Sequence, residues 1–280
     1  MPTEVSKKSR KKLYAVAAIV VVAVIVGALL VPQGTASIPL NVDYTVGEKM
    51  VYDTTLTMSV ENFDSALASG LMGTSPSDIS MNAQQTIEVI DFDGEYYTLN
   101  QTTTMTLVGQ PLSYSVLQKM NKTGYSTYIF NLGDAELSVP DTSYASNSYL
   151  TQLLSRSEVK VGDSITIPFP SALSNMGLTG DLTMTFRGIE DLTVPAGTYK
   201  VFRVDLTSNN LSMDYGSSMS AIGLNSASMN LDLNYQMYME YGTLRQIKST
   251  MQESVSLQSS AMNYTMVLSM DMILSQHIKQ

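Results

Sequence analysis

The regular alternation of apolar and polar residues after residue 40 constrains the fold of this chain more than any other feature. In the segment MNLDLNYQMYMEY, which begins at Met229, every second residue is apolar. Successive side chains of a strand point to opposite faces, so a period of two predicts a strand with one buried face. The apolar positions of this segment are Met229, Leu231, Leu233, Tyr235, Met237, Met239 and Tyr241.

A second segment, MNYTMVLSMDMIL, alternates in the same way and predicts another long strand. Its apolar positions are Met262, Tyr264, Met266, Leu268, Met270, Met272 and Leu274. Long strands with one apolar and one polar face are typical of antiparallel sheets that pack on one side. We therefore predict a mainly β body built on a large curved antiparallel sheet, in the form of either a half-barrel or a sandwich.

Turn residues predict several hairpin corners. Asp93 and Gly94 in IDFDGEYY predict a type I′ turn, in which both central positions have positive φ. Gly242 in MEYGTLRQI marks a second turn, and Pro195 to Gly197 in VPAGTYKV marks a third. We predict that Gly197 adopts a backbone conformation that a Cβ disfavours. These features are corners of a fold rather than sites.

A short pattern occurs twice. TVGEKMVYD at 45–53 and KVGDSITIP at 160–168 share V-G-acid-x-apolar-x-apolar, with Gly47 and Gly162 about 115 residues apart, and similar hairpins follow each copy. An internal duplication explains this pattern, and so does the chance recurrence of a common strand start. A duplication would divide the body into β-rich halves at 41–155 and 156–280.

The start of the chain has the pattern of a membrane anchor. Residues 13–31, LYAVAAIVVVAVIVGALLV, are uncharged and are long enough to span most of a hydrocarbon core of ~30 Å. Basic residues before this segment predict a cytoplasmic tail at 1–12, a transmembrane helix at 13–31 and a linker at 32–40. The alternative is a signal peptide cleaved before Ser37. Both interpretations place the body outside the cytoplasm.

The residue types on which many catalytic sites depend are scarce. The chain has no cysteine and one histidine, His277, which the sequence places in an exposed C-terminal tail. Acidic residues exceed basic ones by nine, which disfavours nucleic acid as a partner. Two-residue spacing of methionines in strands favours packing over Cu(I) binding. We therefore predict that the protein is not an enzyme and has no metal site or cofactor.

One hairpin resembles a known family. LTVPAGTYKVFRVDL resembles secreted and periplasmic β proteins of unknown function with a V-P-A-G-T-aromatic hairpin. Their fold is similar to that of lipoprotein-carrier-like proteins, in which a curved antiparallel sheet wraps an apolar cavity. The resemblance covers about residues 156–250, and it implies this fold and the binding of an apolar molecule. The matching positions are Val161, Gly162, Asp163, Val194, Pro195, Ala196, Gly197, Thr198, Tyr199 and Phe202, with Tyr238, Gly242, Leu244 and Arg245 approximating a later segment.

The chain has nineteen methionines, whose flexible side chains suit surfaces that accept varied apolar ligands. We predict a membrane-anchored, extracytoplasmic protein that binds a lipid or another apolar ligand. The alternative is a structural or interaction module of the cell surface, in which the same residues form a closed core. The predicted pocket residues are Met229, Leu231, Leu233, Tyr235, Met237, Met262, Tyr264, Met266, Leu268 and Met270.

Overall fold

The computed structural model describes residues 42–61, 79–107, 110–122, 126–132, 135–140, 153, 159–168, 178–216, 227–243, 245–258 and 263–279. The predicted tail, membrane helix and linker at 1–40 lie outside these ranges. Within the ranges, no helix has both the length and the apolar character needed to cross a bilayer.

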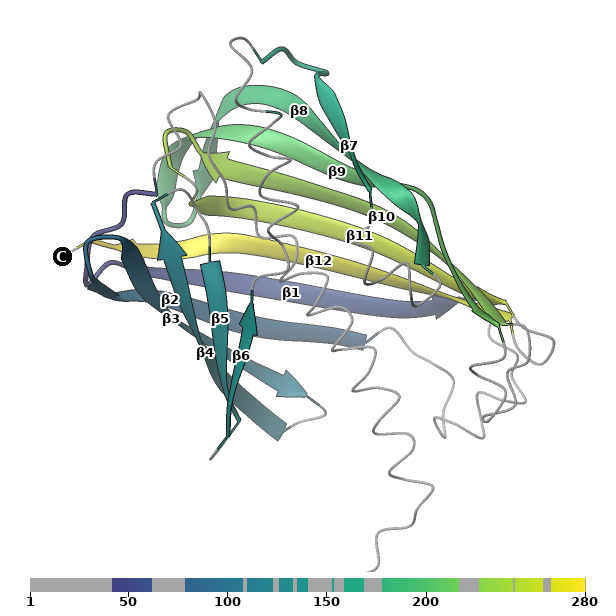
Figure 1. Cartoon of the computed structure of the whole chain (residues 1–280), viewed down its shortest axis with the longest axis horizontal. Coiled ribbons are helices and arrows are strands. Elements are labelled where there is room, and N and C mark those ends of the chain that lie inside the picture. Colours follow the sequence, from purple (N-terminus) through teal and green to yellow (C-terminus); the bar gives the residue numbers. More distant parts are fainter. Residues whose placement is uncertain are drawn as a thin grey trace, which may run out of the picture.

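The described residues form one antiparallel sheet in the order β6-β5-β4-β3-β2-β1-β12-β11-β10-β9-β8-β7 (Figure 1). The prediction of a mainly β, antiparallel fold is confirmed. All twelve described strands belong to one open sheet, so they do not form a two-sheet sandwich. The strands are β1 (Lys49–Glu61), β2 (Ile79–Phe92), β3 (Tyr96–Leu107), β4 (Gln110–Asn121), β5 (Ser126–Leu132), β6 (Ala135–Pro140), β7 (Ser164–Pro168), β8 (Leu178–Val194), β9 (Gly197–Gly216), β10 (Ala227–Glu240), β11 (Gln246–Gln258) and β12 (Asn263–Ile278).

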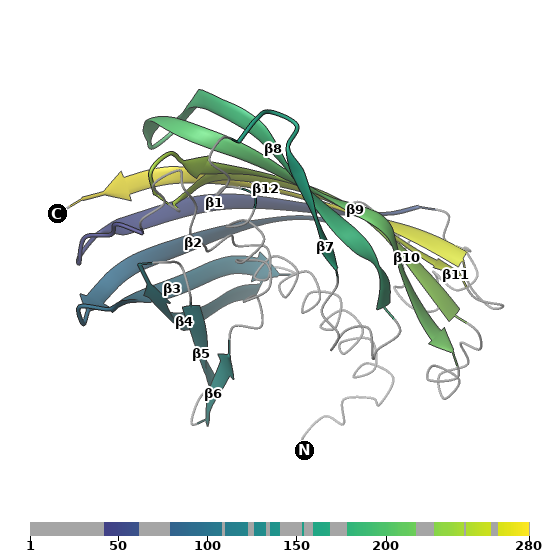
Figure 2. The same ribbon diagram turned by 45° about the horizontal axis from the view of Figure 1, so that its top comes forward.

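The sheet consists of two meanders joined at its centre. Strands β1 to β6 pair in sequence order and lie within residues 41–155, whereas β7 to β12 pair in sequence order within residues 156–280. The first and last strands, β1 and β12, pair with each other and join the two meanders. Figure 2 shows that the joined sheet is strongly curved.

The two V-G-acid segments occupy equivalent places in the two meanders. The Gly47 N–H donates to the Val89 carbonyl of β2 at 2.8 Å, and the Gly162 N–H donates to the Phe186 carbonyl of β8 at 2.9 Å. In both cases the N–H of that strand residue donates in return to the carbonyl of the acidic residue, at 2.9 Å. Both glycines have positive φ, +91° and +96°. The repeated sequence is therefore also a repeated local structure.

The β2–β3 hairpin lies where the sequence predicts it, but its predicted turn type is wrong. Gly94 has a φ of +100°, whereas Asp93 is not in the positive-φ region, as a type I′ turn would require. The Asp93 Oδ1 atom instead accepts hydrogen bonds from the N–H groups of Glu95 at 2.9 Å and Tyr96 at 2.7 Å. These bonds lower the pKa of the Asp93 carboxyl and stabilise a longer loop.

The β8–β9 corner has the backbone that the sequence predicts. Gly197 has a φ of +139°, a region that side chains with a Cβ rarely adopt. We expect Gly197→Val to lower the free energy of unfolding by ~1 to 3 kcal/mol through backbone strain. Thr198→Val, at the next and exposed position, is the matched control. Equal denaturation midpoints for the two variants would contradict this assignment.

Apolar side chains gather on one side of the sheet, here called the inner face. They form a core cluster with members from both meanders, among them Val89, Leu99, Met184, Phe186, Phe202, Leu206, Tyr235 and Met237. The opposite side, the outer face, carries mainly polar residues, as on β10, where Asn230, Asp232 and Asn234 are exposed. One apolar and one polar face is the arrangement that the two-residue period predicts.

Candidate functional site

The predicted residues of β10 and β12 share the inner face, with β11 between the two strands. Met262 lies outside the described residues, and for Tyr264 the structure gives only its backbone pairing with Leu257. The other eight belong to the core cluster or pack against it. Leu231, Leu233, Tyr235, Met237 and Leu268 are buried, and Met229, Met266 and Met270 are partly buried.

The inner face is closed at the end of the sheet that carries the β2–β3, β8–β9 and β10–β11 turns, here called the turn end. The β8–β9 corner folds onto β12, where the Ala196 N–H donates to the Leu274 carbonyl at 3.4 Å. Val194 and Tyr199 from the two sides of this corner pack in a cluster with Met50 and Leu274. The V-P-A-G-T hairpin therefore closes one end of the apolar face.

The apolar side chains of the inner face become less buried toward the end of the sheet opposite the turn end, here called the methionine end. Its half-buried side chains are Met58 of β1, Met81 of β2, Met105 of β3, Met229 of β10, and Met266 and Met270 of β12. Leu112 and Tyr114 of β4 continue this face and are 46% and 38% exposed. In the part of the chain that the structure describes, apolar side chains at this end of the inner face therefore stay half-exposed.

The two ends should respond differently to truncation. Met237, 1% exposed, lies opposite Val204 of β9 in the core, so we expect Met237→Ala to lower the free energy of unfolding by ~2 to 5 kcal/mol. Met266→Ala, at the methionine end, should cost less than ~2 kcal/mol because Met266 is only partly packed. Chemical denaturation of both variants measures the difference. Equal losses would show that the methionine end is packed like the core.

One carboxyl group lies on this apolar face. Glu253 of β11 is 3% exposed and pairs across the sheet with Leu233 of β10 and Leu268 of β12. Its Oε2 atom is buried and has no hydrogen-bond partner. Burial raises the pKa of the Glu253 carboxyl, because the charged form loses its hydration.

A buried ionic cluster lies at the turn end. The Arg245 guanidinium is 3% exposed; its Nη2 donates to Glu48 Oε1 at 2.5 Å, and its Nη1 donates to Glu240 Oε2. The Tyr44 ring lies 5.7 Å from the guanidinium, and Tyr52 donates its hydroxyl hydrogen to the Gln246 carbonyl at 2.9 Å. The cluster joins the start of β1 to the β10–β11 turn, so it links the two meanders.

The charges of this cluster stabilise one another. Burial alone would lower the pKa of Arg245, but the carboxylates of Glu240 and Glu48 outweigh burial and raise it. Burial raises the pKa of the nearby Tyr44 hydroxyl to about 12. Arg245 and Glu48 are each held by a charged partner, so the arrangement suits a structural role better than a catalytic one.

The sequence prediction that His277 lies in an exposed tail is wrong. The His277 side chain is 6% exposed, and its Nε2 lies 2.6 Å from Glu48 Oε1. The Tyr199 hydroxyl lies 3.2 Å from His277 Nδ1. The physical reason is that β12 extends to Ile278 and pairs with β1 at the centre of the sheet. Among the described residues, no group of His, Asp and Glu is arranged to hold a metal ion.

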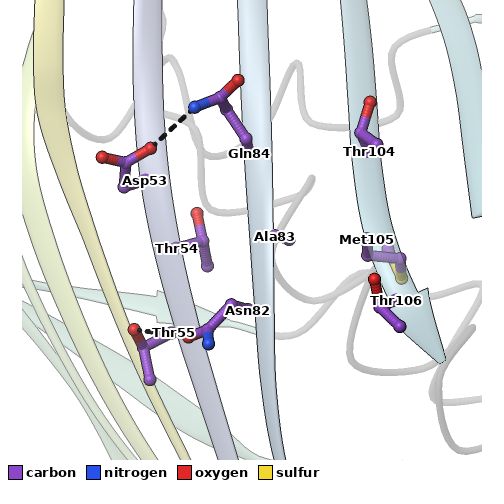
Figure 3. A pocket seen from close by; sticks show the side chains of 9 residues that line it. All are labelled: Asp53, Thr54, Thr55, Asn82, Ala83, Gln84, Thr104, Met105 and Thr106. Carbon is purple, nitrogen blue, oxygen red and sulfur yellow. Dashed lines mark hydrogen bonds between the residues drawn. The ribbon is translucent and has the colours of Figure 1, made fainter. Parts of the chain in front are cut away.

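A pocket of about 490 Å³ lies over β1, β2 and β3 (Figure 3). Gln84 Nε2 donates to Asp53 Oδ1 at 3.0 Å, and Thr55 Oγ1 donates to Asn82 Oδ1 at 3.2 Å. The polar lining differs from the apolar pocket that the sequence predicts, and no predicted pocket residue belongs to it. The lining residues are Asp53, Thr54, Thr55, Asn82, Ala83, Gln84, Thr104, Met105 and Thr106.

No protein-family model matches this chain, and no curated protein matches it. The structure is similar to that of a protein from Bacteroides fragilis described as exported and as having a YmcC-like fold. The TM-score is 0.34 and the identity 9%, over 86% of this chain and 100% of that chain. It is also similar to a protein from Parabacteroides distasonis described as a lipoprotein, with a TM-score of 0.36 and 11% identity over 85% of this chain and 99% of that chain. Similarity at this level carries no information about function.

Proposed function

We propose that this protein is anchored in a membrane, lies on the extracytoplasmic side and binds an apolar or amphipathic ligand at the methionine end of its inner face. The observation that carries the proposal is the continuous apolar face, which is closed at the turn end and half-buried at the methionine end. Partly exposed methionines adapt to apolar molecules of varied shape. The ligand would cover the exposed parts of Met58, Met266 and Met270.

The anchor is supported by the apolar segment at 13–31 and the basic residues before it. We expect protease added to intact cells to degrade the body and leave the N-terminal tail protected. Detergent should be needed to extract the intact chain. Release of full-length protein by a salt wash would contradict the anchor.

The binding site can be mapped on the full chain in its own membrane with a photoreactive fatty acid that carries a diazirine in its alkyl chain. Mass spectrometry of the labelled peptides then shows where the probe lies. We expect labels on residues 13–31, which the proposed anchor places in lipid, and on β1 and β12 around Met58, Met266 and Met270. The anchor serves as an internal positive control, and Met237, buried in the core, should stay unlabelled.

Two variants sharpen this experiment. Met266→Asp and Met270→Asp place a charge on the methionine end and should reduce labelling of the sheet but not of the anchor. Labels confined to residues 13–31 in the parent protein would contradict ligand binding. That result would favour the alternative function, a structural module, which the tight burial of Leu233, Tyr235 and Met237 supports.

The duplication has support of its own. The V-G-acid segments make equivalent hydrogen bonds, and β1 to β6 are matched in order by β7 to β12. We propose that the two meanders derive from one ancestral unit. The acidic side chains of the two segments also make the same bond: Glu48 Oε2 accepts from the N–H of Thr45 and Asp163 Oδ2 accepts from the N–H of Lys160, each at 2.9 Å.

A further inference from the structure

The buried carboxyl of Glu253 differs from the other buried carboxyls of the described residues. Glu48 is bound by Arg245, and Asp205 accepts bonds from Arg187 at 2.7 Å and from Arg203 at 2.8 Å. Each of these two acids therefore has a guanidinium partner. Among the described residues, Glu253 has no guanidinium partner, and its Oε2 atom has no hydrogen-bond partner.

The chain offers no cation near Glu253 among the described inner-face residues. Its neighbours on this face are Leu233 and Leu268 across the sheet, and Met251 and Val255 along β11. Arg245 comes eight residues earlier, before β11 begins, and already binds two carboxylates. A buried acid without a partner is costly, so its presence needs an explanation.

The position of Glu253 relative to the methionine end supplies this explanation. Leu268, directly opposite Glu253, pairs on its other side with Met58 of β1, and it lies between Met266 and Met270 on the same face of β12. A group bound by Glu253 is therefore one strand from the half-buried methionines. An alkyl chain attached to that group would run over them.

We propose that Glu253 binds the ammonium group of an amphipathic amine whose alkyl chain lies on the methionine end. This inference rests on the proposed function, because it names the class of ligand for the same face. An ammonium group carries three donors and a positive charge, which satisfy a buried carboxylate better than a neutral donor does. Burial raises the pKa of the free Glu253 carboxyl, and a bound cation would oppose that shift.

The test uses three probes of equal chain length on the full-length protein in non-ionic detergent: octylamine, octanol and octanoate. Titration calorimetry measures their binding. A charge-assisted hydrogen bond contributes ~1.5 to 3 kcal/mol, so octylamine should bind at least about tenfold more tightly than octanol. Octanoate should bind more weakly than octanol, because it places a second negative charge beside Glu253.

The matched variant is Glu253→Gln, which keeps the shape and removes the charge. It should weaken octylamine binding by about tenfold or more and change octanol binding by less than about twofold. Each probe partitions into the detergent to the same extent in both experiments, so this effect cancels when the affinities of the parent protein and the Glu253→Gln variant are compared.

Two negative results have different meanings. Equal affinities for octylamine and octanol in the parent protein would overturn the role of Glu253 and leave apolar binding standing. No binding of any alkyl probe would overturn the proposed function together with this inference. Even if a Glu253 variant does not fold, comparing octylamine with octanol on the parent protein tests whether the site prefers an ammonium group.

Discussion

Replacing Arg245 with methionine is expected to lower the free energy of unfolding by about 3 to 5 kcal/mol. The substitution keeps much of the apolar volume and removes the cation between Glu48, 1% exposed, and Glu240. Glu48 then remains buried with less compensation for its charge, which is the costly outcome when a buried ion pair is broken. Denaturant unfolding followed by circular dichroism measures the loss.

Two controls separate the buried pair from charge removal in general. Arg187→Met removes a guanidinium that is 45% exposed, and it should cost less than about 1 kcal/mol. The double variant Glu48→Gln with Arg245→Met should recover part of the stability lost in Arg245→Met, because the stranded carboxylate is gone. A loss below about 1 kcal/mol for Arg245→Met alone would show that the cluster contributes little to stability.

Glu253→Leu is expected to stabilise the protein, in contrast to Arg245→Met. It should raise the free energy of unfolding by about 1 to 3 kcal/mol at pH 7.5 in the ligand-free protein. The leucine matches its neighbours Leu233 and Leu268 and removes a buried oxygen that has no partner. Glu190→Leu, at an exposed position of β8, is the matched control and should have little effect. A large destabilisation by Glu253→Leu would show that the carboxyl has a structural partner.

The gain from Glu253→Leu should depend on pH in a defined direction. The pKa of Glu253 is raised in the folded protein, so between the ordinary and the raised pKa the folded state binds more protons than the unfolded state. The contribution of the Glu253 carboxyl to the free energy of unfolding of the parent protein is fully present below the ordinary glutamate pKa. This contribution is lost as the pH rises through the raised pKa of the folded state. The difference between parent and variant should therefore be smallest near pH 4.5 and grow toward neutral pH.

The strands and their faces were predictable because alternation is a local property of the chain. The apolar positions from Met229 to Met239 occupy one face of β10, as their period requires. The turn at Asp93 was not predictable in detail, because its side-chain hydrogen bonds compete with the backbone preference of the Asp-Gly pair. Local sequence predicts the position of a hairpin turn more readily than the backbone geometry of that turn.

The polar residues of the candidate site were harder to predict. Arg245, Glu48 and His277 meet only because β1 and β12 pair at the centre of the sheet, and that pairing has no local signal in the sequence. Glu253 did have a signal. It takes the place of an apolar residue in the alternation of QIKSTMQESVSL, between Met251 and Val255. An acid at an apolar position of a strand is recognisable from the alternation alone.

The pairing of β1 with β12 also affects how the chain can fold. It joins Met50 to His277, so the central contact of the sheet closes a loop of most of the body and forms only after the last strand has emerged. Until then β1 and β11 both present unpaired edges, and such edges attract other extended chains. Folding should therefore be slow, and the half-formed sheet should be the state most exposed to aggregation.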